Sequence, residues 1–208
     1  EPIGLIKSEY RPILNFISSN YGSRLLKNLI ERGDILVLGV FSTQSQVGIY
    51  GVGKKVGYAV LSFIDPLVNS IFPQFTQLIA EKKFKDLLAL IKQFSFMLLI
   101  PATLLLIAAF FTKDSIITMI YGTEFLAASN IFFIILFAAV VAGVTFWNIT
   151  LLISLNEVNF RFRMNLFLLC YSFPMAYFII PHYGAIGAAL ILVSIKIIES
   201  GVGTFKSL

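Results

Sequence analysis

Six apolar segments, separated by short polar connections, constrain the fold of this chain more than any other feature. They lie at 13–41, 47–79, 87–111, 130–155, 164–180 and 185–198. Most are close to the roughly 20 residues that a helix needs to cross a bilayer. A membrane barrel would instead show alternating segments of roughly ten residues. Hydrophobic residues make up 58% of the 208-residue chain and charged residues 13%, against about 25% charged residues in an ordinary soluble domain. The sequence therefore predicts an all-α membrane protein with six transmembrane helices.

The connections predict how the chain is divided. Residues 1–12 are polar and bounded by prolines, which favours a cytoplasmic connecting loop, and residues 13–208 would form the six-helix transmembrane unit. Asn156–Arg163 reads as a tight charged loop and Pro181–Gly184 as a turn. The chain begins at Glu1 without a signal-peptide pattern. We expect it to be part of a longer protein whose first part is missing.

Lysine and arginine alternate between successive connections. Every second connection, together with both ends of the chain, is basic, through Lys7, Arg11, Lys82, Lys83, Lys85, Arg161, Arg163 and Lys206. The remaining connections carry only Lys113. Because basic loops stay in the cytoplasm, this pattern predicts a multi-pass protein with both ends cytoplasmic. The same loops account for the net charge of +5, so no nucleic-acid partner is implied.

Charged residues inside the first two apolar segments are the main functional signal. Arg24, Lys27, Glu31 and Asp34 have the spacing of one helix face, and on the second segment Lys54 and Asp65 also share a face. Charges facing hydrocarbon are costly, so these faces should meet each other, a water-filled cavity or the aqueous edge.

Depth along the hairpin predicts which charges meet. A hairpin centred between Gln44 and Ser45 places Asp34 level with Lys55 and Arg24 level with Asp65. Two interpretations stay open. The charges could form structural ion pairs, or they could line a hydrophilic cavity in which surplus cations await an anionic ligand. The cations outnumber the anions, which favours the cavity and its surplus Lys27, Arg32 and Lys54.

Other residues carry weaker signals. Lys196 and Glu199, near the inner end of the last segment, are expected to form a hydrated pair. Gly51, Gly53 and Gly57 should permit close helix approach. With one cysteine and one histidine the chain offers no metal-ligand cluster, and it carries no nucleotide fingerprint, so no cofactor and no catalytic residue are predicted.

Several short motifs recur in a characteristic order. They are Asp34-x-x-x-Leu38-Gly39-x-Phe41 with Val47-Gly48-Ile49-Tyr50, Ile71-Phe72-Pro73, Tyr121-Gly122-x-Glu124-Phe125, and Pro181-x-Tyr183-Gly184-Ala185-x-Gly187-Ala188-Ala189. In this order and spacing, the chain resembles the C-terminal half of polysaccharide (O-antigen type) flippases, which belong to the multidrug/oligosaccharidyl-lipid/polysaccharide exporter superfamily.

The resemblance implies a fold and a function. The fold would be one lobe of a two-lobed, inverted-V exporter, with the N-terminal lobe outside this chain. The function would be transport of an undecaprenyl-pyrophosphate-linked oligosaccharide repeat unit across the bacterial plasma (inner) membrane, by alternating access around a cationic cavity. Implied partners are that lipid-linked oligosaccharide, the missing N-terminal lobe, membrane lipids and the polysaccharide polymerase machinery.

The charge pattern and the resemblance together suggest site residues. Those expected to face the anionic group of the substrate are Arg24, Lys27, Arg32, Lys54 and Lys55. Asp34 and Asp65 would balance charge or couple transport to an ion.

Two alternative functions stay open. A cation-coupled drug exporter of the same superfamily would need a carboxylate deep in a cation-poor cavity, whereas cations predominate here. A membrane enzyme acting on lipid-linked sugars would need a large outer loop with paired carboxylates. The longest outer loop offers only Lys113, Asp114 and Glu124, so we expect a protein that is not an enzyme.

Overall fold

The chain is helical throughout the part that the structure describes. The computed structural model covers the backbone of residues 2–62, 65–155 and 157–207, and the side chains within these ranges except those of 2–16, 60–61, 65, 67–69, 149 and 205–207. The helices are α1 (Pro2–Phe41), α2 (Gln44–Leu61), α3 (Asp65–Ala80), α4 (Phe84–Tyr121), the short 3-10 turn η1 (Thr123–Phe125), α5 (Ala128–Val144), α6 (Trp147–Ser154) and α7 (Val158–Ser207). The predicted all-α class is confirmed.

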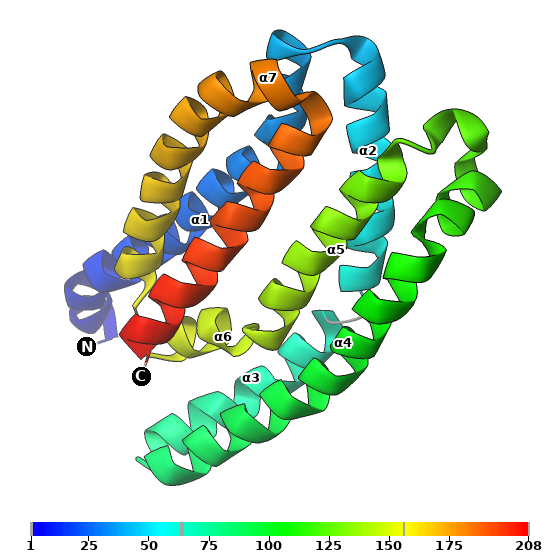
Figure 1. Cartoon of the computed structure of the whole chain (residues 1–208). Coiled ribbons are helices and arrows are strands. Elements are labelled where there is room, and N and C mark those ends of the chain that lie inside the picture. Colours follow the sequence, from blue (N-terminus) through cyan, green and yellow to red (C-terminus); the bar gives the residue numbers. More distant parts are fainter. Residues whose placement is uncertain (1, 63–64, 156, 208) are drawn as a thin grey trace.

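Helix α7 is a pair of antiparallel arms, 158–183 and 185–207, rather than one straight rod (Figure 1). The break lies at Gly184, whose backbone has φ 53° and ψ −131°. The side chains of Tyr171 and Ser194 meet across the arms at 3.3 Å. The turn expected at Pro181–Gly184 is therefore present. Glycine is needed there because L side chains rarely adopt this backbone conformation.

Several predicted boundaries are wrong. Residues 2–12, expected as a loop, form the first turns of α1. The second apolar segment is divided between α2 and α3, and the fourth between α5 and α6. Much of the polar connection expected at 112–129 instead continues α4 to Tyr121. Isolated polar residues do not end a helix whose backbone bonds are made within the segment, whereas Gly122, with φ 89°, does.

Two helices are long and apolar enough to cross a membrane by themselves, over Phe84–Tyr121 and Val158–Thr204. Helix α5 is apolar but has only 17 residues, and α1 carries several charges. Six crossings therefore remain a prediction. In α4 the apolar face points outward, with Phe111 77% and Met119 90% exposed. Such a continuous apolar surface suits lipid or another protein, and water poorly.

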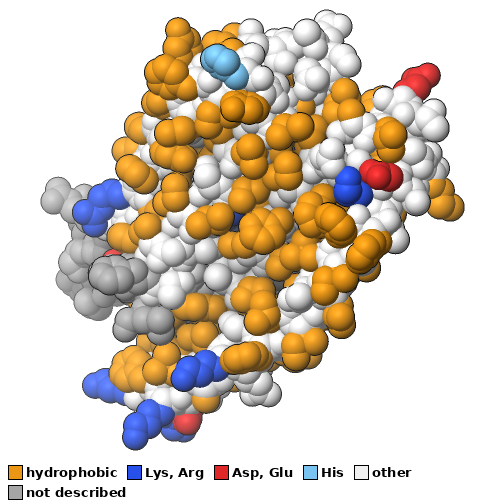
Figure 2. Space-filling model, viewed as in Figure 1, with side chains coloured by type: hydrophobic (Ala, Val, Ile, Leu, Met, Phe, Trp, Pro, Cys, Tyr) orange, Lys and Arg blue, Asp and Glu red, His pale blue; other side chains and the backbone are white. Residues whose placement is uncertain are grey.

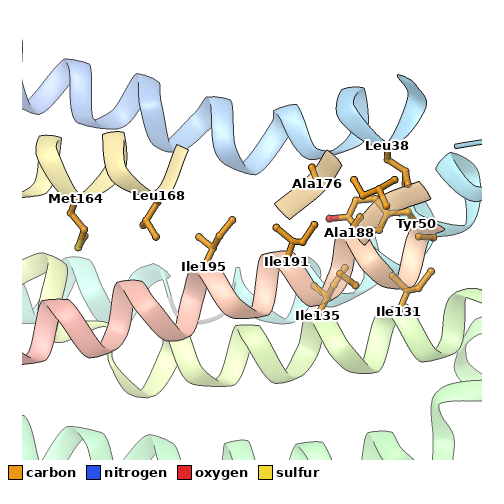
Figure 3. Packing of buried hydrophobic residues seen from close by; sticks show 13 residues of the cluster. Leu38, Tyr50, Ile131, Ile135, Met164, Leu168, Ala176, Ala188, Ile191 and Ile195 are labelled. Atoms are coloured by element: carbon orange, nitrogen blue, oxygen red, sulfur yellow. The ribbon is translucent and has the colours of Figure 1, made fainter. Parts of the chain in front are cut away.

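The main core lies between α1, α2, α5 and both arms of α7. In Figure 3 the second arm of α7 presents Ile191 and Ile195 between Met164 and Leu168 of the first arm on one side and Ile135 of α5 on the other. A second cluster joins α3, α4 and α6 around Phe75. The helices therefore pack as one connected bundle.

Helices α2 and α5 approach closely at two glycines. A Cβ atom at Gly53 would lie 2.8 Å from Ile131 Cγ2, and one at Gly57 would lie 2.7 Å from Ile135 Cγ2. The predicted packing role is confirmed for these two positions. It is wrong for Gly51, where a Cβ would meet nothing within 4 Å.

Basic residues gather at one end of the molecule. Both chain termini and the turn between α3 and α4 lie at the same end (Figure 1). In Figure 2 most of the visible Lys and Arg side chains lie toward that end, whereas the opposite end shows His182 and the acidic residues near η1. The bundle thus has the charge asymmetry that the alternating loops suggested.

Candidate functional site

A buried ion pair joins α1 to α2. Lys54 Nζ lies 2.6 and 2.7 Å from the two carboxylate oxygens of Asp34 and also donates to the backbone oxygen of Glu31. The hydroxyl of Tyr50 donates to the same carboxylate. Tyr50 is fully buried, and the Lys54 ammonium lies 5.6 Å from the centre of its ring. Asp34 is therefore held by two donors from α2.

A second set of ion pairs joins α1 to the second arm of α7. Lys196 Nζ lies 2.7 Å from Glu31 and 3.2 Å from Glu199, and Lys27 Nζ lies 3.4 Å from Glu199. The side chains of Lys196 and Glu199 are only 9% and 14% exposed. The expectation of a hydrated pair at these two positions is therefore wrong, because α1 covers them.

These residues form one balanced group, which we call the ion network. Its members are three lysines and three carboxylates: Lys27, Lys54, Lys196, Glu31, Asp34 and Glu199. The predicted excess of cations does not hold for Lys27 and Lys54, because each has a carboxylate partner. The count made on the first two segments omitted the lysine and glutamate that α7 contributes.

The predicted depth matching is wrong by one residue. Asp34 pairs with Lys54, not with Lys55, which is exposed. Successive helix residues point about 100° apart, so Lys55 turns away from α1 at almost the same depth. The predicted partner of Arg24, Asp65, has a side chain outside the described residues. Arg24 and Arg32 are exposed.

An apolar groove opens beside the ion network, between α1 and both arms of α7. Its volume is about 380 Å³. Its walls are mostly aliphatic and aromatic, with Leu36 and Phe173 among them, while Glu31, Asp34 and Lys196 add charged groups to the lining. The groove thus offers hydrocarbon walls with charged groups beside them.

One buried cation lies outside the ion network. Arg161, in the first arm of α7, is 5% exposed, although the sequence placed it in a charged loop. Three buried side-chain atoms have no hydrogen-bond partner: Asn20 Oδ1, Tyr58 Oη and Arg161 Nη1. Sequence reasoning missed Arg161 because it treated every loop arginine as exposed.

The described residues hold no group of three or more His, Cys, Asp or Glu side chains that could bind a metal ion. The carboxylates of the ion network are occupied by lysine ammonium groups instead. The site therefore consists of charged and apolar surfaces suited to binding an amphipathic molecule.

Together these features define a class. The chain is a helical membrane protein with an internal ion network beside an apolar groove. A family model described as "polysaccharide biosynthesis protein" matches residues 3–130, and the chain belongs to this family. Membership in a polysaccharide flippase family, suggested by the motifs, is confirmed at this level.

A curated relative supports the same conclusion. Over 161 residues the chain is 26% identical to the probable low-salt glycan biosynthesis flippase Agl15 of Haloferax volcanii. The match covers 76% of this chain but only 33% of that relative, so the chain spans about a third of its length. No solved structure matches the chain.

Proposed function

We propose that this chain is part of a flippase that moves a lipid-linked oligosaccharide across a membrane. The observation that carries the proposal is the groove between α1 and α7, with apolar walls and charged groups beside them. A lipid-linked sugar has the same two-part character, with a hydrocarbon tail joined through an anionic group to a polar glycan. The relative's name, which describes a flippase, supports transport rather than catalysis.

The finer proposal follows the motif resemblance. The cargo would be an undecaprenyl-pyrophosphate-linked repeat unit of an O-antigen type polysaccharide, moved across the bacterial plasma membrane. The chain would be the six-helix, C-terminal lobe of a two-lobed exporter, working with an N-terminal lobe and supplying a polysaccharide polymerase. The gathering of basic residues at the end that holds both termini supports a cytoplasmic position for that end.

The charged residues would act in two groups. Arg24, Arg32 and Lys55 are exposed and would contact the anionic group of the substrate directly. Lys27 and Lys54 are held by carboxylates and would become available only when helices separate during transport. Asp34, and in the same role Asp65, would balance these charges or couple transport to an ion.

Filling the groove tests the proposal. Gly33 lines the groove, and a Cβ atom there would meet nothing within 4 Å. Gly33→Leu should therefore leave the fold intact, and even favour the helix, while placing four carbons where the substrate would lie. We expect the full-length protein with this change to restore surface polysaccharide at least tenfold less well in a strain that lacks its own flippase.

The matched control is Gly48→Leu. Gly48 is also helical, is also free of neighbours within 4 Å and does not line the groove. Both variants should accumulate in the membrane at wild-type amounts. Wild-type polysaccharide with Gly33→Leu, or equal losses in the two variants, would contradict a role for the groove in transport.

A further inference from the structure

The guanidinium group of Arg161 has no partner in the described structure. Arginine carries five N–H donors and stays charged. No hydrogen bond or ion pair from the Arg161 side chain is found among the described residues, and Nη1 is fully buried. The residue as a whole is 5% exposed. A buried charge without a partner is among the costliest features that a fold can retain, so its presence calls for a physical reason.

Close packing of α1 against the first arm of α7 explains the burial. Asn165 donates to both the hydroxyl and the backbone oxygen of Ser23, at 2.8 and 3.0 Å. The ring of Phe162 lies where a Cβ atom at Gly22 would be, 2.9 Å away. These contacts hold the two helices together on either side of Arg161. The side chain therefore cannot simply extend into solvent without disturbing that packing.

The surroundings of Arg161 carry an excess of positive charge. The charged groups that act on it are Glu199, which attracts it, and Arg24, which repels it. Glu199 is already shared between Lys27 and Lys196. Because the ion network is balanced without Arg161, this arginine and the exposed Arg24 are left without an anion.

We propose that Arg161, assisted by Arg24, is a binding site for a phosphate group at the end of the bundle where α7 begins. The planar guanidinium fork matches two phosphate oxygens at once, and two arginines suit an anion that carries more than one charge. The site does not depend on the proposed transport function. The phosphate could belong to the diphosphate of a lipid-linked glycan or to the headgroup of a bilayer phospholipid.

The test measures how phosphate compounds change thermal unfolding of the purified full-length protein. The protein is kept in dodecyl maltoside, which contains no phosphate. One arm adds geranyl pyrophosphate, and the other adds short-chain phosphatidylglycerol. A ligand that binds only the folded state raises the unfolding temperature as its concentration passes its Kd. The arm that stabilises the protein at lower concentration identifies the source of the phosphate.

Three variants locate the site. Arg161→Gln should weaken binding about tenfold or more, as expected for the loss of charge-assisted hydrogen bonds, and Arg24→Gln should weaken it several-fold. Arg163→Gln is the matched control: it removes the same charge two residues along, from an exposed side chain, and should bind within about twofold of wild type.

A measurement without ligand separates binding from a structural role. Since Arg161 is buried and unpaired, Arg161→Met should leave the ligand-free protein at least as stable as wild type. The proposal is overturned if neither compound stabilises wild type or if Arg161→Gln responds like Arg163→Gln. It is also overturned if Arg161→Gln or Arg161→Met fails to fold, because Arg161 would then have a structural partner. Loss of transport in the groove variant bears on none of these outcomes.

Discussion

At the scale of single residues, Lys196 is the member of the ion network on which most depends. It is the only lysine within 4 Å of the Glu31 carboxylate among the described residues, and it also contacts Glu199. Removing one partner of a buried ion pair leaves the other charge uncompensated. The network should therefore respond to loss of Lys196 more than to loss of any exposed lysine.

We expect Lys196→Met to destabilise the protein by about 2–3 kcal/mol, near the lower end for a broken buried pair because Glu31 is 25% exposed. Thermal unfolding in detergent should show a fall of about 5–10 °C. Adding Glu31→Gln should recover part of this loss, since the stranded charge is removed. Lys55→Met, at an exposed lysine, is the control and should change little. No loss in Lys196→Met would mean that the network contributes nothing to stability.

Sequence reasoning could find the charged stripe but not all of its partners. The i, i+3, i+7 spacing correctly put Lys27, Glu31 and Asp34 on one face, because helical geometry fixes that relation. The partners Lys196 and Glu199 are more than 160 residues away. Their positions depend on how helices pack, and no local pattern reports that. The same limit concealed the burial of Arg161.

At the scale of helices, the turns at one end of the bundle are tied together. The side-chain oxygen of Gln46, at the start of α2, accepts a hydrogen bond of 3.0 Å from the backbone N–H of Ala185. A Cβ atom at Gly184 would lie 2.8 Å from that same oxygen. Gly184 is therefore constrained twice, by its backbone conformation and by its neighbour.

Gly184→Ala should lower stability by about 2 kcal/mol, because alanine is strained at φ 53° and would displace Gln46. The measurement is again the unfolding temperature. Gly201→Ala serves as the control in the same arm of α7. It is helical and has nothing within 4 Å of the added Cβ, so it should leave stability unchanged or slightly raise it. Equal behaviour of the two variants would show that the turn tolerates a side chain.

Helix class was easier to predict than helix ends. Apolar length and composition sufficed for the all-α class and for the turn at Gly184, where proline, glycine and polar residues coincide. They failed at the division between α2 and α3 and at the extension of α4 to Tyr121. Residues 112–121 remain helical because helix continuation costs little once the preceding turns are formed.

At the scale of the whole molecule, the charge asymmetry predicts orientation. Cysteines introduced singly at Ser45 and Lys83, both exposed, would lie at opposite ends of the bundle. With Cys170, the one cysteine of this chain, replaced by serine, a membrane-impermeant maleimide should label position 45 on intact cells and leave position 83 unlabelled. Both should react after the membrane is opened. Labelling of position 83 on intact cells would reverse the proposed topology.

The distance in sequence between the halves of the ion network has a consequence for biosynthesis. Glu31 emerges from the ribosome 165 residues before its partner Lys196. At roughly 5–20 residues per second, α1 must wait about 10–30 s with its carboxylate unneutralised. During that interval the translocon or an insertase has to shelter a helix that bare lipid would reject. Final assembly of the bundle is therefore completed only when the last hairpin of the chain arrives, and premature termination would strand α1 rather than leave a smaller folded unit.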